Sequence, residues 1–352
     1  MIKSVKKRIR KLKQRLISYK ISRYKYLHII YNDKFLPSVI NFLNKNFNTK
    51  EHAIIVIKLL GFGYPHAENV YTLDTLKYIN LNNTKIEKII CHSLYVPGLA
   101  KKLFDNKEAL QKKVYWIIYG GDLYTAPRNE IEDYVRSNFK GYITCDESIL
   151  EERYQIKYHN FFKLIYNFPI KKDVLDTVIM QKHDNIIIQI NNSCDFSTLE
   201  MLEVLKRFKA ENIIIKTILS YGDLEYKDEI IIKGKEIYGD KFIYLDTMLS
   251  PEKYAQELAN NDILILNQNR QQGLGNTIAS LYLGKKVFIR HDVTTYSELM
   301  DFGFHINDTM AIKSMDFNSF IVQHDNENKA VAAQCYNDNY IKQLWNIIFA
   351  DK

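Results

Sequence analysis

The sequence predicts an α/β protein with two Rossmann-like domains, each a parallel sheet covered by helices, preceded by a basic helix. The 352 residues suit two domains of ordinary size, and 46% hydrophobic residues are enough for two cores. Short apolar runs alternate with stretches of helical periodicity, which is typical of parallel α/β sheets. One charged stretch containing a proline divides this alternation into two sets.

Residues 26–170 form the first predicted domain. Strands are expected where short apolar runs occur, at 26–30, 53–60, 86–91, 114–119 and 141–144. Residues 36–47 have the apolar spacing of a helix. The aromatic stretch after residue 154 ends in NFPIKKD, and we place the crossing between the domains at 168–182.

Residues 171–352 form the second predicted domain. Its strands are expected at 185–190, 212–219, 241–245, 262–266 and 286–290. Its helices are expected at 197–209, 225–238, 251–259 and 276–283. Ser197 followed by Glu200 matches a capping box at the start of one helix, and Gly284 suits the end of another.

Residues 1–25 carry eleven Lys or Arg and no acidic residue, so the rest of the chain is nearly neutral. Val5, Ile9, Leu12 and Leu16 form one apolar stripe on a helix, with basic residues on its other faces. Such a helix fits an anionic membrane surface, where each basic residue contributes on the order of 1 kcal/mol. The alternative is a solvated tail or a helix docked on its own protein.

Other classes of partner and segment are not expected. No further basic patch with aromatic residues follows, so nucleic acid is not a predicted partner. No apolar core follows the N-terminal charges, so we expect no secretory signal, and no apolar run is long enough to span a membrane.

The cysteines and histidines show no pattern of metal ligands. The cysteines are Cys91, Cys145, Cys194 and Cys335. They lie far apart with no CxxC pair, so we expect free thiols. The histidines considered are His28, His52, His66 and His92. We expect no metal and no other cofactor, and we expect His28, inside an apolar run, to be a core residue with satisfied ring nitrogens.

The strongest chemical signal is the loop after the strand at 262–266, which reads NQNRQQGLGN. Two glycines let the backbone approach a ligand, and the N-terminus of the next helix offers unpaired N–H groups and a partial positive charge. We predict a diphosphate site formed by Arg270, Gln271, Gln272, Gly273, Gly275 and Asn276. The pattern is neither GxGxxG nor a Walker loop, and the alternative is a tight turn between packed elements.

A second polar loop, with Asn192 and Ser193, follows the first strand of the second domain. Ligands of open α/β sheets bind at the carboxyl ends of the strands. This loop is therefore expected to face the Gly-rich loop and to hold the same diphosphate, although polar loops at such positions are common.

Two aspartates are candidates for a general base. Asp33 follows the first predicted strand, and Asp122 follows Gly120 and Gly121 after the strand at 114–119. A general base must reach the proton that it takes, and both residues follow strands at the edge of the sheet where ligands bind. The alternatives are solvation or capping for Asp33 and a helix cap for Asp122.

Together these motifs resemble the bacterial TDP-N-acetylfucosamine:lipid II N-acetylfucosaminyltransferases, which act in enterobacterial common antigen assembly. The resemblance covers about residues 26–300. It rests on RQQGLG at 270–275, on the W-x-x-x-G-x-DLY pattern of Trp116, Gly120 and Asp122–Tyr124, on Asn192–Ser193, on Ser220–Tyr221 where the family has Gly-Tyr, and on Asp33.

The resemblance implies a GT-B fold with the two sheets facing a cleft, and an inverting, metal-independent glycosyltransferase. It implies a dTDP-linked deoxy-amino sugar as donor, similar to N-acetylfucosamine, and a polyprenyl-diphosphate-linked glycan as acceptor. It implies peripheral attachment at the cytoplasmic face of the bacterial inner membrane, with the acceptor on the first domain and the donor on the second. Asp33 would be the base, with Asp122 second, and Tyr221 would join the donor site.

The sequence departs from the family at several points. The loop 32–34 lacks the His pair that follows the family's Asp, and Gly121 replaces an Ala. The basic helix is not part of the family pattern. Other readings therefore stay open: a transferase using UDP- or GDP-sugars for capsule or O-antigen, a two-Rossmann nucleotide-sugar epimerase, or a non-enzymatic binding module on a membrane. A retaining transferase is disfavoured because 276–283 contains no acidic residue.

Overall fold

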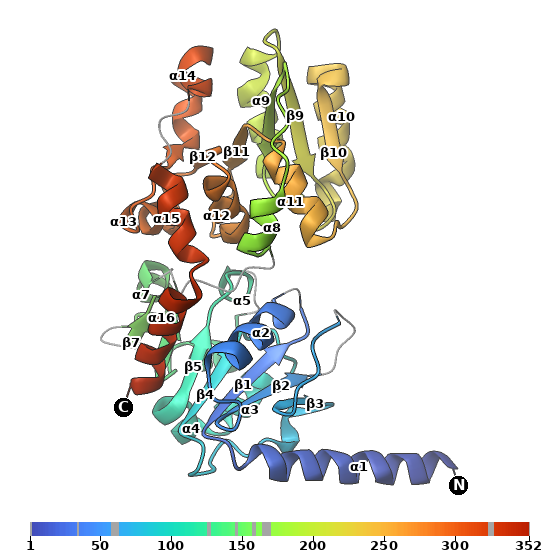
Figure 1. Cartoon of the computed structure of the whole chain (residues 1–352), viewed down its shortest axis with the longest axis vertical. Helices are drawn as coiled ribbons and strands as arrows, with labels where there is room; N and C mark the ends of the chain where they lie inside the picture. Colours follow the sequence, from blue (N-terminus) through green and yellow to red (C-terminus); the bar gives the residue numbers. More distant parts are fainter. Residues whose placement is uncertain are drawn as a thin grey trace. The chain divides into compact units, whose positions relative to one another are not determined.

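The computed structural model describes residues 2–33, 35–57, 63–124, 128–144, 147–156, 160–163, 170–322 and 327–351. The chain divides into two compact units. Unit 1 comprises Met1–Pro169 with Asp338–Lys352, and unit 2 comprises Ile170–Asn337. Figure 1 shows that each contains a sheet with helices packed on it. The α/β class predicted from the sequence is confirmed.

Within the described residues, unit 1 has a seven-stranded parallel sheet with the order β3-β2-β1-β4-β5-β6-β7. The strands are β1 Tyr26–Tyr31, β2 His52–Ile57, β3 Val70–Leu73, β4 Lys88–His92, β5 Val114–Ile117, β6 Gly141–Ile143 and β7 Asn160–Phe162. The helices are α1 Ile2–Ile21, α2 Leu36–Asn46, η1 Leu76–Tyr78, α3 Leu99–Phe104, α4 Lys107–Lys113, α5 Gly121–Tyr124, α6 Glu130–Arg136, α7 Glu147–Tyr154 and α16 Asp338–Ala350.

The five strands predicted for this domain are present, with ends that differ by a few residues. Residues 58–60 of the second predicted strand lie outside the described part of the chain. Strands β3 and β7 were not predicted. Both are edge strands, of four and three residues, and such short segments give no clear periodic pattern.

Unit 2 has, in its described residues, a six-stranded parallel sheet with the order β10-β9-β8-β11-β12-β13. The strands are β8 Ile186–Ile190, β9 Ile213–Ile218, β10 Phe242–Leu245, β11 Ile263–Leu266, β12 Lys286–Ile289 and β13 Asn307–Asp308. The helices are α8 Lys172–Thr177, α9 Ser197–Leu205, η2 Lys206–Phe208, η3 Leu224–Tyr226, α10 Lys227–Tyr238, η4 Gly239–Lys241, α11 Pro251–Ala259, α12 Leu274–Tyr282, α13 Thr294–Asp301, η5 Thr309–Ser314, α14 Phe317–Ile321 and α15 Glu327–Cys335.

Two local predictions about helix ends have opposite outcomes. Gly284 has φ +73° just after α12, as a C-terminal glycine should, and the N–H of Lys285 donates to the carbonyl of Ser280 at 2.8 Å. The capping box at Ser197 is wrong, because α9 begins without a side-chain cap. Instead Ser197 donates its N–H and its hydroxyl to the carboxylate of Asp195, at 2.9 and 2.6 Å.

The last helix belongs to unit 1, and its prediction as part of the second domain (171–352) is wrong. Trp345 and Phe349 of α16 pack edge-to-face against histidines of the first sheet, with ring centroids 5.7 Å from His28 and 4.8 Å from His52. Lys45 of α2 also pairs with Asp338 at 2.6 Å. Apolar periodicity identifies an amphipathic helix but does not say which sheet it covers.

Three buried histidines form a hydrogen-bonded row across this sheet. His28 on β1 lies between His52 on β2 and His92 on β4, with 3.1 Å between the ring nitrogens of each pair. The other nitrogen of His92 lies 3.3 Å from the Tyr119 hydroxyl. Burial lowers the pKa of His52 to about 4, that of His92 to about 3, and that of His28 well below its ordinary value. The prediction of His28 as a satisfied core residue is confirmed.

Two further sequence predictions concern the cysteines and membrane-spanning segments. Cys91, Cys194 and Cys335 are buried free thiols, as expected, and Cys145 lies outside the described residues. In the described ranges, no helix combines the length and the apolar character needed to cross a bilayer.

Candidate functional site

The predicted site residues lie at the carboxyl edges of the two sheets, close to the strands where each strand order reverses. In unit 2 the reversal lies between β8 and β11, and the loops after these strands contain Asn192–Ser193 and Arg270–Gly273. In unit 1 it lies between β1 and β4, and Asp33 follows β1. Ligands of open α/β sheets bind outside such points.

In unit 2 the two predicted loops are in direct contact. The side-chain amide of Gln272 donates to the hydroxyl of Ser193. Asn191, with φ +54°, accepts the N–H of Asn267 at 2.8 Å, which ties the loop after β8 to the end of β11. The two loops therefore meet, as the sequence predicted.

Gly273 makes the close approach of the two loops possible. Its φ is +74°, in the left-handed region that favours glycine, and it precedes α12 as the N-cap residue. A Cβ atom at this position would lie 2.9 Å from Nδ2 of Asn192. Any larger residue would therefore push Asn192 away from the loop.

Helix α12 begins two residues earlier than predicted, at Leu274. Gly275 and Asn276 consequently lie in its first turn, where backbone N–H groups have no acceptor within the helix. The Asn276 side chain donates to the Tyr254 hydroxyl at 3.0 Å, which directs it back to the protein. The first turn thus offers N–H groups and the positive end of the helix dipole next to Gly273.

Several buried polar atoms of these loops have no hydrogen-bond partner within the described structure. They are Oδ1 of Asn192, both side-chain polar atoms of Gln268, Oε1 of Gln271 and Oε1 of Gln272. Buried polar groups are normally paired, and leaving one unpaired costs about 1–3 kcal/mol. This concentration of unpaired amides in two adjoining loops indicates a binding site for a polar ligand.

Tyr221 and Arg270 lie beside these amides. The hydroxyl of Tyr221 accepts a hydrogen bond from Asn192 at 3.2 Å. Burial raises the pKa of Tyr221 to about 12, against the opposing effect of the nearby Arg270 guanidinium. Arg270 is half-buried and forms no ion pair with the described part of the chain. A half-buried arginine beside donors is suited to an anionic ligand.

The loop that presents Tyr221 is fixed by a tight crossing of two backbones. Gly222 has φ +99°, and a Cβ there would lie 2.3 Å from the carbonyl oxygen of Cys194. The N–H of Cys194 donates to the carbonyl of Tyr221 at 2.8 Å, and the N–H of Asp223 donates to the carbonyl of Cys194 at 2.9 Å. Tyr221 is therefore held rigidly against the loop after β8.

In unit 1, Asp33 lies at the start of α2. Its Oδ1 accepts the N–H groups of Phe35 at 2.8 Å and Leu36 at 3.3 Å. Asp33 is half-buried, and the Phe35 ring stacks on Tyr119 with centroids 4.9 Å apart. The capping role weighed for this residue is thus present, and it fixes the carboxylate at the edge of the sheet beside Tyr119.

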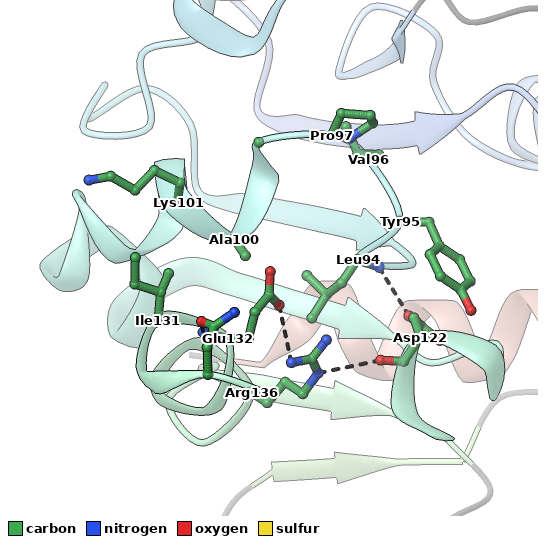
Figure 2. Close-up of a pocket in the computed structure, with 12 residues that line it drawn as sticks. Leu94, Tyr95, Val96, Pro97, Ala100, Lys101, Asp122, Ile131, Glu132 and Arg136 are labelled. Atoms are coloured by element: carbon green, nitrogen blue, oxygen red, sulfur yellow. Dashed lines mark hydrogen bonds and ion pairs between the residues drawn. The ribbon is translucent and has the colours of Figure 1, made fainter. Parts of the chain in front are cut away.

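Asp122 is fully buried, and Figure 2 shows its carboxylate bonded to Leu94. Oδ2 accepts the N–H of Leu94 at 3.0 Å and the indole N–H of Trp116 at 2.7 Å, and Oδ1 accepts the N–H of Tyr119 at 3.1 Å. Burial raises its pKa, and these donors lower it in part. The carboxylate joins the loops after β4 and β5 and so fixes the positions of these two loops.

Beside Asp122, unit 1 contains a cavity of about 300 Å³ (Figure 2). Aliphatic side chains form much of its wall, including Leu94, Val96 and Ile131. Arg136 is 1% exposed, pairs with Glu132 at 3.1 Å and donates to the backbone carbonyl of Asp122. The cavity can admit a small apolar group, and Arg136 and Glu132 in its wall pair with each other.

Sequence reasoning missed four residues at these edges. Tyr119, Gln268 and Tyr254 lie at strand ends or on helices without a motif of their own. Ser93 has φ +72°, an unusual conformation for a residue other than glycine, directly after β4. Its position after a buried strand was the one available signal. Within the described ranges, no three His, Cys, Asp or Glu side chains gather as a metal site requires.

No protein-family model matches the chain, and no curated protein matches its sequence. Its structure is similar to a UDP-forming trehalose-phosphate synthase from Burkholderia xenovorans, with a TM-score of 0.64 and 10% identity, over 93% of this chain and 98% of the other. It is similar to sucrose-phosphate synthase from Thermosynechococcus elongatus, with a TM-score of 0.62 and 10% identity, over 93% of this chain and 99% of the other. It is also similar to Anabaena HepE in complex with UDP and glucose, with a TM-score of 0.60 and 10% identity, over 94% of this chain and 100% of the other.

These similarities extend over nearly the whole length of each protein, and they show that this chain has the GT-B fold. The GT-B prediction is thereby confirmed. At 10% identity the similarity concerns the fold. Function must be argued from the sites described above.

Proposed function

We propose that the protein is an inverting glycosyltransferase that takes a sugar from a nucleoside-diphosphate donor. The observation that carries the proposal is the group of unpaired buried amides around Arg270 and the first turn of α12, at the strand-order reversal of unit 2. Arg270 and the N–H groups of the first turn of α12 suit a diphosphate, and the unpaired amide oxygens suit N–H or O–H donors of a base or a sugar. The fold is one whose similar structures include sugar transferases and one with UDP and glucose bound.

The finer proposal follows the sequence resemblance. The donor is a dTDP-linked deoxy-amino sugar similar to N-acetylfucosamine, and the acceptor is a glycan linked to polyprenyl diphosphate, in the synthesis of a bacterial surface polysaccharide. Such an acceptor would locate the reaction at the cytoplasmic face of the inner membrane. Arg270, Gln272 and the N–H groups of Gly275 and Asn276 would hold the diphosphate without a metal ion.

In the proposed reaction an acceptor hydroxyl attacks the anomeric carbon of the donor. A new carbon–oxygen bond forms as the bond to the phosphate oxygen breaks, and dTDP leaves with the electron pair. Asp33 accepts the hydroxyl proton, since Asp122 is fully buried and already bonded to three donors. Arg270 and the helix N-terminus stabilise the charge that develops on the leaving diphosphate.

Product analysis tests the proposal. The full-length protein is incubated with dTDP-, UDP- and GDP-sugars, with and without a polyprenyl-diphosphate-linked sugar. Release of the nucleoside diphosphate that depends on the acceptor, with the sugar moving into the lipid fraction, is the expected result. A free sugar product formed without acceptor would instead indicate an epimerase, and binding without turnover of any donor would indicate a binding module.

A further inference from the structure

Helix α1 carries a stripe of exposed apolar side chains. Val5, Ile9, Leu12, Leu16 and Tyr19 are each between 51% and 63% exposed. Their spacings of 4, 3, 4 and 3 residues place them on one face of the helix. Single exposed apolar residues are ordinary, but an aligned row along a whole helix marks an interaction surface.

The opposite face of α1 is docked on unit 1, near β3 and η1 (Figure 1). Arg10 pairs with the carboxylate of Asp74 at 2.6 Å, and the N–H of Asp74 donates to Gln14 at 3.0 Å. The hydroxyl of Ser18 donates to a backbone carbonyl of η1 at 2.5 Å, and Ile21 is part of the hydrophobic core. The helix is therefore held in one orientation, with its stripe turned away from the unit that holds it.

Basic residues line both sides of the stripe. Helical spacing places Lys6, Lys13 and Lys20 along one side and Arg8 and Arg15 along the other. All five are exposed, and none forms an ion pair with the described part of the chain. The exposed face of α1 is thus an apolar centre between two rows of unneutralised positive charge.

We propose that this face binds the surface of an anionic lipid bilayer while α1 remains docked on unit 1. A bilayer supplies both complements together, because the apolar side chains enter the acyl boundary while the rows of charge contact anionic headgroups. The sequence left membrane binding and docking as alternatives for this helix. The structure shows that the docked face and the apolar stripe are different faces, so one does not exclude the other.

Two other occupants fit less well. The spacing of the stripe is also that of a two-stranded coiled coil, so a second copy of α1 is geometrically possible. The flanking positions that would face each other between two helices are all Lys or Arg, with no acidic residue in α1 to pair with them. A nucleic acid would match the charge and leave five apolar side chains without a partner.

Vesicle flotation with the full-length protein tests the proposal, independently of sugar transfer. We expect the protein to bind vesicles containing a third phosphatidylglycerol and to bind pure phosphatidylcholine far more weakly. The triple variant Lys6→Gln, Lys13→Gln, Lys20→Gln should weaken binding roughly a hundredfold, since each basic residue near an anionic surface is worth about fivefold in affinity. The double variant Ile9→Ser, Leu16→Ser should also lose binding at constant charge.

A matched control removes the same charge elsewhere. The triple variant Lys209→Gln, Lys235→Gln, Lys253→Gln alters exposed lysines of unit 2 and should bind vesicles like the unaltered protein. Circular dichroism verifies that each variant is folded. Equal loss in the control, or equal binding to both kinds of vesicle, would overturn the proposal. So would a concentration-dependent dimer that the Ile9→Ser, Leu16→Ser variant abolishes, because the stripe would then be a contact between copies.

Tryptophan fluorescence tests directly whether the apolar stripe of α1 enters the bilayer. The native tryptophans Trp116 and Trp345 are buried, at 0% and 2% exposure, so their emission should change little. In the variant Leu12→Trp, anionic vesicles should shift the emission of the new side chain to shorter wavelength. Flotation without such a shift would mean that the stripe stays in water, and it would contradict the proposal.

Discussion

The carboxyl edges of the two sheets differ in how fully their polar groups are used. At the edge of unit 2, Asn192, Gln268 and Gln271 are buried with side-chain atoms that have no partner in the described structure. At the edge of unit 1, the buried Asp122 accepts from Leu94, Trp116 and Tyr119. Unpaired buried groups cost stability, so a protein retains them where a ligand pairs them.

This difference distinguishes residues that stabilise the fold from residues that are suited to binding a ligand. Asp122 was a candidate general base in the sequence, and in the fold its carboxylate joins the loops after β4 and β5. Gln271 was one predicted donor among several, and its buried side-chain oxygen has no partner among the described residues. Two kinds of substitution test this difference: those that should change stability alone, and those that should change binding or turnover alone.

The largest effect is expected for Asp33→Asn. If Asp33 is the base, turnover should fall about 10²–10⁴-fold, while nucleotide binding stays unchanged. The fold should persist because the asparagine oxygen can still accept from Phe35 and Leu36. Steady-state kinetics with the donor and acceptor check this, with Asp105→Asn at the end of α3 as control. Activity within a few-fold of the unaltered protein would place the base elsewhere.

Asp122→Asn should act on stability. The amide oxygen can still accept from Leu94 and Trp116 in place of Oδ2, but the amide nitrogen then faces the N–H of Tyr119. This unpaired buried donor should lower the free energy of unfolding by about 1–3 kcal/mol. Urea unfolding measures it, with Asp33→Asn as the comparison. A variant of normal stability that has lost turnover would instead make Asp122 the base.

The histidine row should make unit 1 sensitive to acid. The folded pKa values of His52 and His92, about 4 and 3, lie below the usual 6.5, so the unfolded chain binds more protons below pH 6.5. Stability is therefore complete above that pH and falls as the pH decreases toward 4, by about 1.4 kcal/mol per pH unit for each histidine.

Unfolding free energies measured between pH 8 and pH 5 check this slope. His52→Asn should reduce the slope by the contribution of one proton, whatever its effect on stability at pH 8. An unchanged slope in the variant would show that His52 is already charged in the folded state, and that the row is not a neutral hydrogen-bonded chain.

Arg270→Ala should weaken binding of the nucleoside diphosphate about 10–150-fold, because hydrogen bonds to a charged group contribute about 1.5–3 kcal/mol. Unfolding should hardly change, since Arg270 forms no ion pair with the described residues. Calorimetric titration measures the affinity, with Arg128→Ala in unit 1 as control. Equal affinities would remove Arg270 from the site.

Much of the candidate site in unit 2 could be predicted because it depends on local sequence. Gly273 and Asn192 follow buried strands, and the carboxyl ends of neighbouring parallel strands meet at one edge. Strand alternation likewise predicted both sheets. Contacts between residues distant in sequence could not be predicted. The row of His52, His28 and His92 depends on the register of three strands, which no local pattern fixes.

The same limit applies to α16 and Asp122. The apolar face of α16 fits any sheet, and only tertiary contact assigns it to the histidines of unit 1. Asp122 follows two glycines at a strand end, as catalytic residues often do, and its burial became visible only in the fold. In α1 the stripe was readable from the sequence, whereas the docking of its opposite face was not.

Nucleotide binding to the full-length protein is the most direct test of the proposed donor site in unit 2. Thermal unfolding is followed with dTDP, UDP, GDP and CMP, each with and without a divalent metal, for the unaltered protein and for Arg270→Ala. Stabilisation by dTDP above the others, without metal and lost in the variant, is the expected result. Absence of stabilisation by every nucleotide, or equal stabilisation of the variant, would contradict a diphosphate site at Arg270 and α12.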